Sequence, residues 1–359
     1  MENSIRPEGP NAAGIAGVRS RRPVIAIAGA GGAVGSRLAA MLPPEAALVG
    51  IVRHPAASGH AESMEWRTCD FFSQEEALHA LAGVDTAIYL LHAGKPSAGL
   101  TQGTSRDLNA LLAEHFAFAA AASGVGRIIC LNGNTPPGAP RQRWAGNLQE
   151  RREAEGILAS HGVPLTIISA GGAEPLHAAA AICAALGYGA DAGEDGTGEA
   201  VREASGQAEC AHEADRRRDV RSVQRFSLPD GMDAEQAALH YVDWLSRIGR
   251  PLLRVDRNAA GECRIYAAGI PRPLLQLTER RQASASRCFA FGISGGLLSR
   301  KGTAGRGRLE FLLLPGSREC LAAIHDFIPS LPWLLYKSTQ AQLHLLVMYA
   351  FGRHLKKWR

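Results

Sequence analysis

The sequence predicts an α/β fold in which a doubly wound parallel sheet is followed by a smaller α+β part with an antiparallel sheet and a long C-terminal helix. Three observations favour this class. Short apolar runs alternate with longer helical segments over the first half of the chain. These runs are apolar enough for a sheet that is covered on both faces, which is typical of parallel strands. Farther along, one helix is followed by closely spaced β-like runs.

The first half contains six predicted strands, each followed by a helix or a turn. The predicted strands are 24–29, 47–53, 64–70, 85–93, 127–133 and 164–170. The predicted helices between them are 33–42, 74–83, 106–124 and 147–162. Strands that alternate with helices of this length form crossover units and a parallel sheet.

The second half begins after a change in composition. Residues 176–221 are rich in Ala, Gly and charged residues and have almost no large apolar side chains after Tyr188, so we expect a linker that begins with at most one short helix. A helix is then predicted at 233–249, and a long one from about Pro332. The β-like runs between them are 252–256, 263–269, 274–280, 287–298, 308–314 and 320–328.

These segments predict four parts of the chain. We expect a disordered tail at 1–22, a first domain at 23–175, the linker at 176–221 and a second domain at 222–359. The element order of the last part suits a helix-grip fold, in which a curved antiparallel sheet wraps a long helix around an apolar pocket. Such a pocket would take a lipophilic ligand, but Trp333, Leu334, Leu346 and Phe351 at helical spacing are more often core residues, and the sequence favours that interpretation.

Composition excludes several classes of function. The 39 Lys and Arg against 34 Asp and Glu give a formal charge of +5, which is too mild and too dispersed for a nucleic-acid-binding protein. The seven cysteines form no CxxC pair and have no histidine at zinc spacing, so we expect no metal site. Reduced thiols indicate a cytoplasmic protein, and we find no secretory signal and no apolar run of bilayer length.

A glycine motif follows the first predicted strand. Gly29, Gly32 and Gly35 are spaced G-x-x-G-x-x-G between that strand and a helix. Glycines at this place let backbone N–H groups at the helix N-terminus approach a phosphate closely. The context predicts a Rossmann-like dinucleotide site, and the residues expected to bind the cofactor there are Gly29, Gly31, Gly32, Ala33, Val34 and Gly35.

Arg53 ends the second predicted strand, at the position whose side chain distinguishes NAD from NADP in Rossmann-like sites. An acidic residue there binds the ribose 2′-hydroxyl of NAD, whereas an arginine accommodates the 2′-phosphate of NADP. No carboxylate accompanies Arg53, so the sequence favours NADP over NAD as cofactor. An ordinary solvated arginine at a strand end is the alternative.

The first half resembles the atypical short-chain dehydrogenase/reductase-like NAD(P)-binding proteins of bacteria, near the NmrA-like and complex-I-associated members. The resemblance rests on "GAGGAVG", "VRHP", "CDFF", "VDTAIYLLHA" and "RIICLNG", and covers about 23–172. It implies that Asp70 and Phe71 border the adenine. It also implies that Leu91, His92 and Ala93 line the ribose on the nicotinamide side.

The pair that carries catalysis in reductases of this kind is missing. The resemblance implies a Tyr-x-x-x-Lys pair on the helix after the fifth strand, but Asn147 and Arg151 stand at those positions. At the preceding strand end, Asn132 stands near the expected serine, and an amide cannot relay a proton as a hydroxyl does. His92 is a weak substitute candidate for proton transfer. Arg151 and Glu153 lie on a helix rich in charge, which favours a solvated helix face over a site.

These features leave several functions open. The protein is either an NADP(H)-binding oxidoreductase or epimerase-like enzyme without the Tyr-x-x-x-Lys pair, or a non-catalytic NADP(H)-sensing or scaffold module. A third alternative is a lipophilic-ligand carrier that acts through its C-terminal part. The basic end "GRHLKKWR" adds either peripheral contact with an anionic membrane or an ordinary solvated helix end.

Overall fold

The computed structural model describes most of the chain, in nine ranges. These are 22–43, 45–54, 64–93, 98–132, 141–169, 174–188, 219–280, 287–303 and 305–358, with the backbone alone for 141–147. Nearly all of the predicted tail at 1–22 and most of the predicted linker at 176–221 lie outside the described residues.

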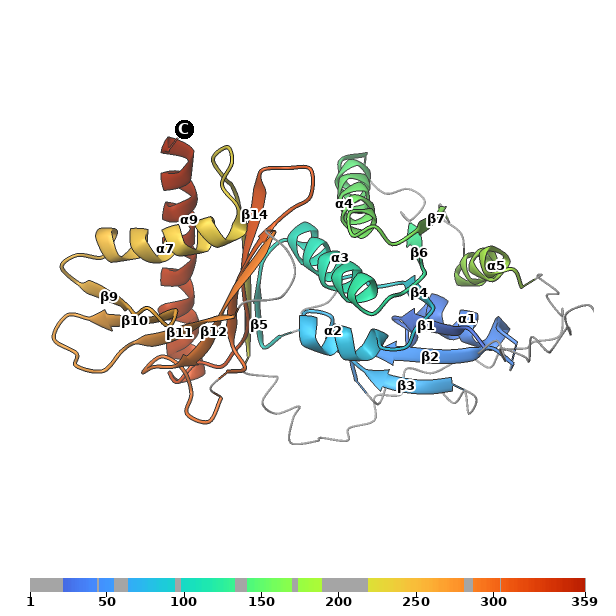
Figure 1. Ribbon diagram of the computed structural model, residues 1–359, viewed down its shortest axis with the longest axis horizontal. Coiled ribbons are helices and arrows are strands. Elements are labelled where there is room, and N and C mark those ends of the chain that lie inside the picture. Colours follow the sequence, from blue (N-terminus) through green and yellow to red (C-terminus); the bar gives the residue numbers. More distant parts are fainter. Residues whose placement is uncertain are drawn as a thin grey trace, which may run out of the picture.

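A six-stranded parallel sheet forms the first half, in the order β3-β2-β1-β4-β6-β7 (Figure 1). Its strands are β1 (Val24–Ala28), β2 (Ala47–Val52), β3 (Met64–Thr68), β4 (Thr86–Tyr89), β6 (Arg127–Asn132) and β7 (Leu165–Ser169). The chain starts in the middle, runs outward to β3 and returns to add β4, so the strand order reverses beside β1. This is the doubly wound arrangement that the sequence predicts, and ligands bind such sheets where the order reverses.

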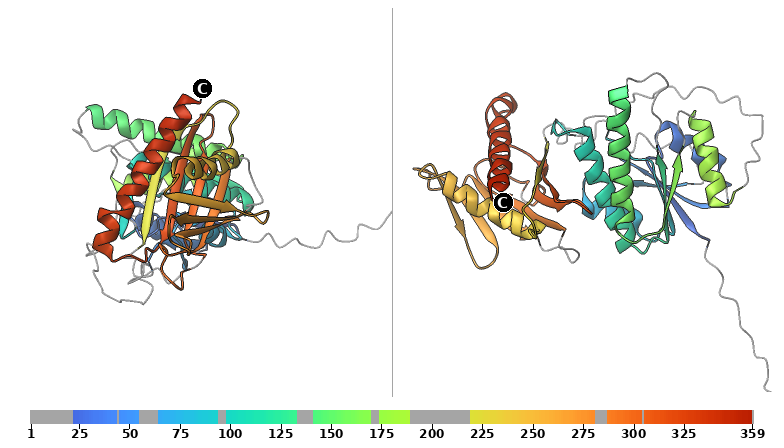
Figure 2. Two further views of the ribbon diagram at one scale, coloured as in Figure 1. Left: turned by 90° about the vertical axis from the view of Figure 1, so that its left-hand side faces the viewer. Right: turned by 90° about the horizontal axis from the view of Figure 1, so that it is seen from above.

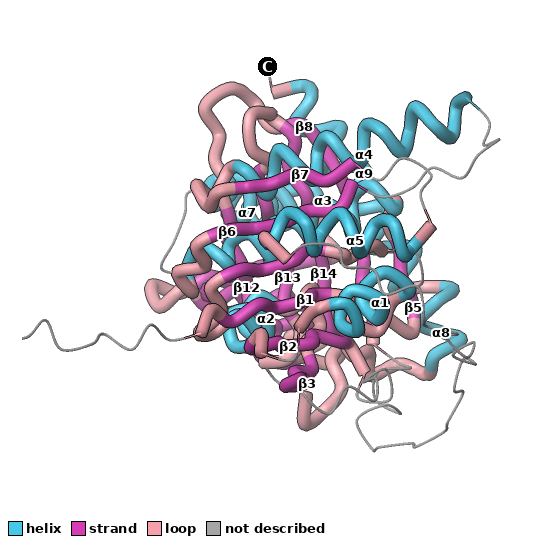
Figure 3. The backbone as a smooth tube through the Cα atoms, turned by 90° about the vertical axis from the view of Figure 1, so that its right-hand side faces the viewer, coloured by secondary structure: helices cyan, strands magenta, loops and turns pink. Residues whose placement is uncertain are grey.

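Helices cover both faces of this sheet. The bounds are α1 (Ala33–Met41), α2 (Gln74–Leu81), α3 (Ser105–Ala122), α4 (Arg141–Ala159) and α5 (Pro175–Leu186). The helices α1 and α5 pack together on one face, where Leu38 and Ile182 share an apolar cluster with Ile27 (Figure 3). The helices α2, α3 and α4 cover the other face. The residues expected to start a linker at 176 therefore lie in α5, which belongs to this unit.

A second sheet of eight strands forms the rest of the molecule, in the order β5-β8-β14-β13-β12-β11-β10-β9. Its strands are β5 (Leu100–Gln102), β8 (Val220–Ser227), β9 (Leu253–Arg257), β10 (Glu262–Ala267), β11 (Leu275–Arg280), β12 (Cys288–Gly295), β13 (Arg308–Leu313) and β14 (Glu319–Phe327). The pairs are antiparallel except for β5 with β8. This confirms the predicted antiparallel sheet, although its edge strand β5 comes from the first half of the chain.

Two helices pack on the outer face of the second sheet, namely α7 (Ala234–Ile248) and α9 (Gln340–Lys357), and the short α8 (Trp333–Ser338) precedes α9. Aromatic side chains fill the space between them and the sheet. They are Phe226, Tyr241, Trp244, Phe311 and Phe351. The region expected to enclose an apolar pocket is thus a packed core. None of the described helices is long and apolar enough to span a lipid bilayer.

The inner face of the second sheet packs on the helices of the first unit. Val223, Leu312 and Leu321 belong to the same apolar cluster as Leu111 and Phe116 of α3. Viewed across the molecule, the layers are helix, parallel sheet, helix, antiparallel sheet and helix (Figures 1 and 2). One helical layer, which contains α3, therefore serves both sheets.

Candidate functional site

The glycine turn after β1 has the geometry of a phosphate cradle. Gly29 has φ = +95°, a left-handed conformation that other residues rarely adopt. A Cβ on Gly35 would lie 2.5 Å from the carbonyl oxygen of Gly29, so only glycine lets α1 approach the turn this closely. Gly32 has an ordinary extended backbone, and its missing side chain leaves the space above the turn open.

The N-terminus of α1 is free of internal partners that would compete with an anion. Its N-cap is Gly32, so no side chain caps the first turn, and no acidic residue lies in that turn. Backbone N–H groups and the positive end of the helix dipole therefore point toward the open space. A pyrophosphate group fits this cradle.

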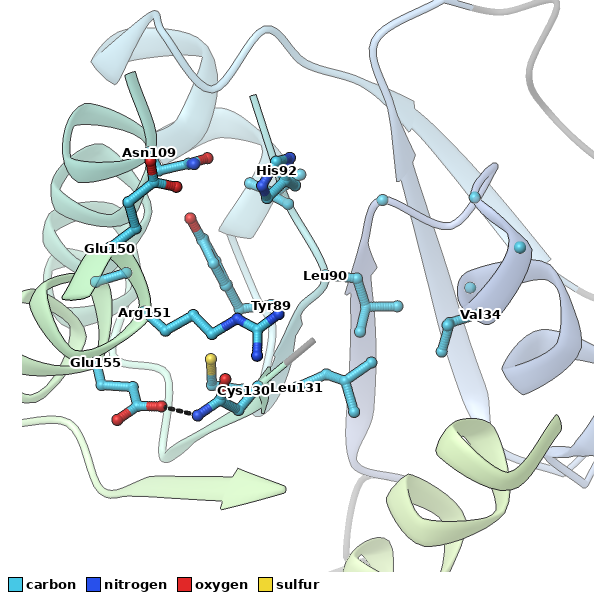
Figure 4. A pocket seen from close by; sticks show the side chains of 17 residues that line it. Val34, Tyr89, Leu90, His92, Asn109, Cys130, Leu131, Glu150, Arg151 and Glu155 are labelled. Atoms are coloured by element: carbon cyan, nitrogen blue, oxygen red, sulfur yellow. Dashed lines mark hydrogen bonds between the residues drawn. The ribbon is translucent and has the colours of Figure 1, made fainter. Parts of the chain in front are cut away.

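A cavity of about 550 Å³ extends from the turn along the carboxyl ends of the parallel strands. Its glycine side consists of Gly29 and the residues from Gly32 to Gly35. The remaining lining residues are Tyr89, Leu90, Leu91, His92, Asn109, Cys130, Leu131, Asn132, Glu150, Arg151, Ala154 and Glu155. Figure 4 shows the charged side chains of α4 on one side of this space and Val34 on the other. The volume suits a ligand of cofactor or drug size.

Two of the three residues expected along the nicotinamide-side ribose, Leu91 and His92, line the cavity. The Ala93 amide donates a hydrogen bond to Asn109 Oδ1 at 2.8 Å, which ties the chain after β4 to α3. Gly31 lies in the exposed turn and is not among the lining residues.

Arg53, Asp70 and Phe71 lie at the ends of β2 and β3, outside the cavity lining. Arg53 Nε lies 4.0 Å from Asp70 Oδ1. Burial alone would raise the pKa of Asp70, but the guanidinium groups of Arg221 and Arg53 lower it below its ordinary value. The Phe71 ring packs against Phe116 in the core. The Phe71 side chain is therefore a core residue, and its predicted place beside the adenine stays a prediction.

The wall formed by α4 and the end of β6 carries the polar chemistry of the cavity. Asn132 Nδ2 donates to Glu155 Oε1 at 2.5 Å. Burial raises the pKa of Glu155, against the opposing charges of Arg151 and Arg152. A carboxyl group with a raised pKa keeps its proton to a higher pH than an ordinary glutamate, which is the property a general acid needs. Asn132 Oδ1 is buried and has no hydrogen-bond partner within the described residues, so it can accept one from a ligand.

The other titratable groups at the floor of the cavity are held neutral. Burial raises the pKa of the Cys130 thiol to about 12, and burial likewise raises the pKa of Tyr89 far above its usual value. Neither forms the charged nucleophile or base that a thiolate or phenolate would supply. His92 is exposed at the rim.

Three of the four candidate catalytic residues predicted from the sequence line the cavity in the structure. His92, Asn132 and Arg151 meet at the cavity, and Arg151 lies on the wall where the lysine of the missing pair is expected. The side chain of Asn147 lies outside the described residues. Glu153 does not lie on a solvated face: it accepts hydrogen bonds from Arg106 of α3 and from Arg225 of the second sheet, at 2.8 Å each.

Sequence reasoning missed eight lining residues, namely Tyr89, Leu90, Asn109, Cys130, Leu131, Glu150, Ala154 and Glu155. Glu155 follows Arg151 by four residues and therefore shares its helix face, a signal that could have identified it. Tyr89 and Cys130 lie in or beside strand ends already assigned to the site. Asn109 lies within an apolar helix, and no sequence pattern distinguishes it.

The second sheet holds the segment that follows β3. His115 Nδ1 lies 3.0 Å from the Phe71 carbonyl oxygen, and its Nε2 lies 2.9 Å from Glu310 Oε1 on β13. Arg308 donates to the carbonyl oxygen of Phe72. Arg221 Nη2 lies 3.1 Å from Asp70 Oδ2, and the Arg221 guanidinium stacks on the Phe72 ring at 3.9 Å. The predicted adenine side of the site is thus fixed by side chains of the antiparallel sheet.

The family model described as NAD(P)H-binding matches residues 29–212. A relative of nearly equal length, auxiliary protein GraX of Staphylococcus aureus, is 23% identical over 331 residues, which are 92% of each chain. The match therefore extends across both sheets and not only across the first.

Two solved structures match part of the chain. The NADPH-dependent quinone oxidoreductase QOR2 of Escherichia coli in complex with NADPH is 25% identical over 40% of this chain and 47% of that chain, with a TM-score of 0.30. Triphenylmethane reductase of Citrobacter sp. in complex with NADP(H) is 22% identical over 40% of this chain and 48% of that chain, also with a TM-score of 0.30. The chain thus spans about half the length of each.

The family match agrees with the geometry described above. It begins at Gly29, the first residue of the glycine turn, and includes every lining residue of the cavity. The matched residues make up just over half of the 359-residue chain. The protein belongs to the NAD(P)H-binding family, as its resemblance to atypical short-chain dehydrogenase-like proteins predicts.

Proposed function

We propose that the protein binds NADP(H) in the cavity at the carboxyl edge of the parallel sheet, with the pyrophosphate at the N-terminus of α1. The observation that carries this proposal is the glycine cradle: Gly29 and Gly35 are required by the backbone, and Gly32 leaves the cavity open where a side chain would fill it. An uncapped helix N-terminus beside it supplies the N–H donors for a phosphate.

The preference for NADP(H) over NAD(H) rests on Arg53. Its guanidinium lies at the end of β2 beside Asp70, and its side chain is about one third exposed, so it remains accessible to a phosphate. The 2′-phosphate of NADP carries the charge that an arginine at this place recognises. No carboxylate of the described strand end takes the role of binding a free ribose hydroxyl.

We further infer that the protein is an oxidoreductase that acts on a carbonyl-like or quinone-like acceptor. Bound NADPH supplies a hydride. Glu155, whose carboxyl group faces the cavity, donates the proton that the acceptor oxygen gains in the same reduction, and is then reprotonated from solvent. The Arg151 guanidinium lies on the same helix face and stabilises negative charge that develops on that oxygen.

The described cysteines are free thiols. Free thiols are typical of a reducing compartment, and this supports a cytoplasmic location as part of the proposal.

The binding proposal is tested by calorimetric titration of the full chain with NADPH and NADH. Gly32→Trp should abolish NADPH binding, because its extended backbone accepts a side chain while the indole fills the cradle. Gly156→Trp is the matched control, since Gly156 lies on the exposed side of α4 with open space around its Cα. Arg53→Gln should weaken NADPH binding by roughly tenfold or more and leave NADH binding unchanged.

Three results would contradict the proposal. No binding of either dinucleotide by the unmodified protein overturns it altogether, and full NADPH binding by Gly32→Trp removes the cavity as its location. A preference of the unmodified protein for NADH contradicts the role assigned to Arg53.

A further inference from the structure

The exposed face of α9 is apolar in its N-terminal half, which follows the short helix α8. One face of α9 packs Met348, Phe351 and Leu355 on the second sheet. On the opposite face, Leu343, Leu346 and Tyr349 are 60%, 63% and 64% exposed, and we call these three residues the apolar stripe. Leu334 and Leu335 of α8 are exposed next to it. The sequence interpretation of Leu334 and Leu346 as core residues is therefore wrong, although it holds for Phe351.

The apolar stripe continues into a basic end on the same helix face. Arg353 and Lys357 follow Leu346 by seven and eleven residues, spacings that return to one side of a helix. Lys356 lies beside them, and all three are exposed. After Asp326 the sequence contains five Lys or Arg and no Asp or Glu. The surface of α9 thus combines exposed leucines with basic residues, and neither α8 nor α9 contains an acidic residue.

The basic end is held firmly against α7. The His240 and His354 rings are stacked, with Nε2 atoms 3.0 Å apart, and the Trp358 ring also stacks on His240, at 4.2 Å between ring centroids. Trp358 is itself about half exposed. An aromatic ring, cations and leucines are therefore presented on one rigid helix.

We propose that α9 lies on an anionic membrane surface, with the apolar stripe inserted at the boundary between headgroups and acyl chains. Helices that bind membranes in this way pair an apolar face with Lys and Arg and carry aromatic residues at the interface. Each basic residue near an anionic lipid surface adds about 1 kcal/mol of attraction. A second copy of this chain docked at the same face would bring basic surfaces of like charge together, which disfavours it as the occupant.

The position of α9 allows this contact without closing the dinucleotide cavity. The helix lies on the outer side of the antiparallel sheet, on the far side of that sheet from α3 and the parallel sheet (Figures 1 and 2). The lining residues of the cavity all belong to the parallel-sheet unit. Membrane binding is therefore independent of the proposed function.

The test is co-sedimentation of the full chain with phosphatidylglycerol vesicles and with phosphatidylcholine vesicles. We expect binding to phosphatidylglycerol vesicles that weakens with salt, and little binding to phosphatidylcholine vesicles. Leu346→Asp should lower the partition coefficient at least tenfold, because a charge replaces the central leucine. Lys356→Gln combined with Lys357→Gln should lower it roughly 30-fold, from the loss of two attractive charges.

Leu176→Asp is the matched control, since Leu176 is a half-exposed leucine on α5, at the other end of the molecule. Circular dichroism of each variant shows whether it is folded. Absence of binding to phosphatidylglycerol vesicles, or equal loss in Leu176→Asp and Leu346→Asp, overturns the proposal. A dimer of the unmodified chain that Leu346→Asp dissociates in sedimentation also overturns it, because the occupant is then a second copy.

Discussion

Glu155 is the residue on which the proposed chemistry depends. Its carboxyl group accepts a hydrogen bond from Asn132 at 2.5 Å, and burial raises its pKa against the charges of Arg151 and Arg152. The phenol and thiol at the cavity floor are held neutral, with their pKa values raised by burial. In the proposed reduction, Glu155 therefore takes the place of the tyrosine in the Tyr-x-x-x-Lys pair.

Replacing Glu155 separates binding from chemistry. Glu155→Gln keeps the size of the side chain and its ability to form hydrogen bonds, but removes the acidic proton. The rate of NADPH-dependent reduction, measured with a panel of quinone and aldehyde acceptors, should therefore fall by roughly 100-fold or more. The affinity for NADPH should be unchanged. Since only the protonated acid donates, the rate of the unmodified protein should fall as pH rises through the raised pKa of Glu155. A rate in Glu155→Gln equal to that of the unmodified chain would assign the proton to another group.

Individual residues of the site differ in how well their sequence signal identifies them. Gly29 and Gly35 follow from the motif, because backbone conformation and close approach permit only glycine there. Arg151 follows from its place on the helix after the fifth strand of the parallel sheet. Asn109 reaches the site through a tertiary contact with the Ala93 amide, and such contacts leave no local pattern in the sequence.

Among the secondary-structure elements, hydrophobic patterns in the sequence identify the buried strands of the parallel sheet. They miss the strands β5 and β8, which lie where the antiparallel sheet contacts the helices of the parallel sheet. The strands β1, β2 and β6 are apolar runs long enough to predict. In contrast, β5 has three residues, and β8 alternates arginines with apolar residues because its charged side chains pair across the contact. Only the tertiary structure supplies partners for such residues, so the sequence alone does not mark them as strand.

Strand β14 contains an irregularity that the sequence pattern does not predict. His325 and Asp326 are adjacent, and regular alternation would direct them to opposite faces. The register shifts between Ile324 and Phe327, and Asp326 has φ = +52°. As a result His325 contacts Glu310 while Asp326 pairs with Arg308 at 2.9 Å, and both residues join the contact between the two units.

His325 makes this contact sensitive to acid. It is fully buried, and its Nε2 lies 3.4 Å from Glu310 Oε2 without a well-aligned hydrogen bond. Burial, followed by the charge of Arg308, lowers the pKa of His325 to about 4. A lowered histidine pKa contributes stability that is present above the unfolded value of about 6.5 and is lost as pH falls toward 4.

The free energy of unfolding should therefore fall by about 3 kcal/mol from this group between pH 7 and pH 4, at about 1.4 kcal/mol per pKa unit. Chemical denaturation at a series of pH values measures the fall. His325→Gln should reduce the slope, whereas His79→Gln, an exposed histidine on α2, should leave it unchanged. Identical slopes in the unmodified chain and in His325→Gln would show that the imidazole does not control this contact.

At the scale of the whole molecule, the helical layer with α3 unites two sheets that the sequence predicts separately. The arrangement of apolar residues along the chain predicts both sheets, because buried parallel strands and antiparallel strands have different hydrophobic patterns. It does not predict that residues 70–72 beside the dinucleotide site would be held by Arg221, Arg308 and Glu310 from the second sheet. Both sides of such a contact are far apart in the sequence.

Hydrogen–deuterium exchange of the full chain with and without NADPH tests whether the dinucleotide occupies the cavity between the glycine turn and α4. We predict slower amide exchange at 29–36, 90–93 and 130–132 when NADPH is bound, since these backbone segments line or adjoin the cavity, and unchanged exchange in α9. With saturating NADPH, protection that is confined to the antiparallel sheet, or no protection at 29–36, would contradict binding in this cavity.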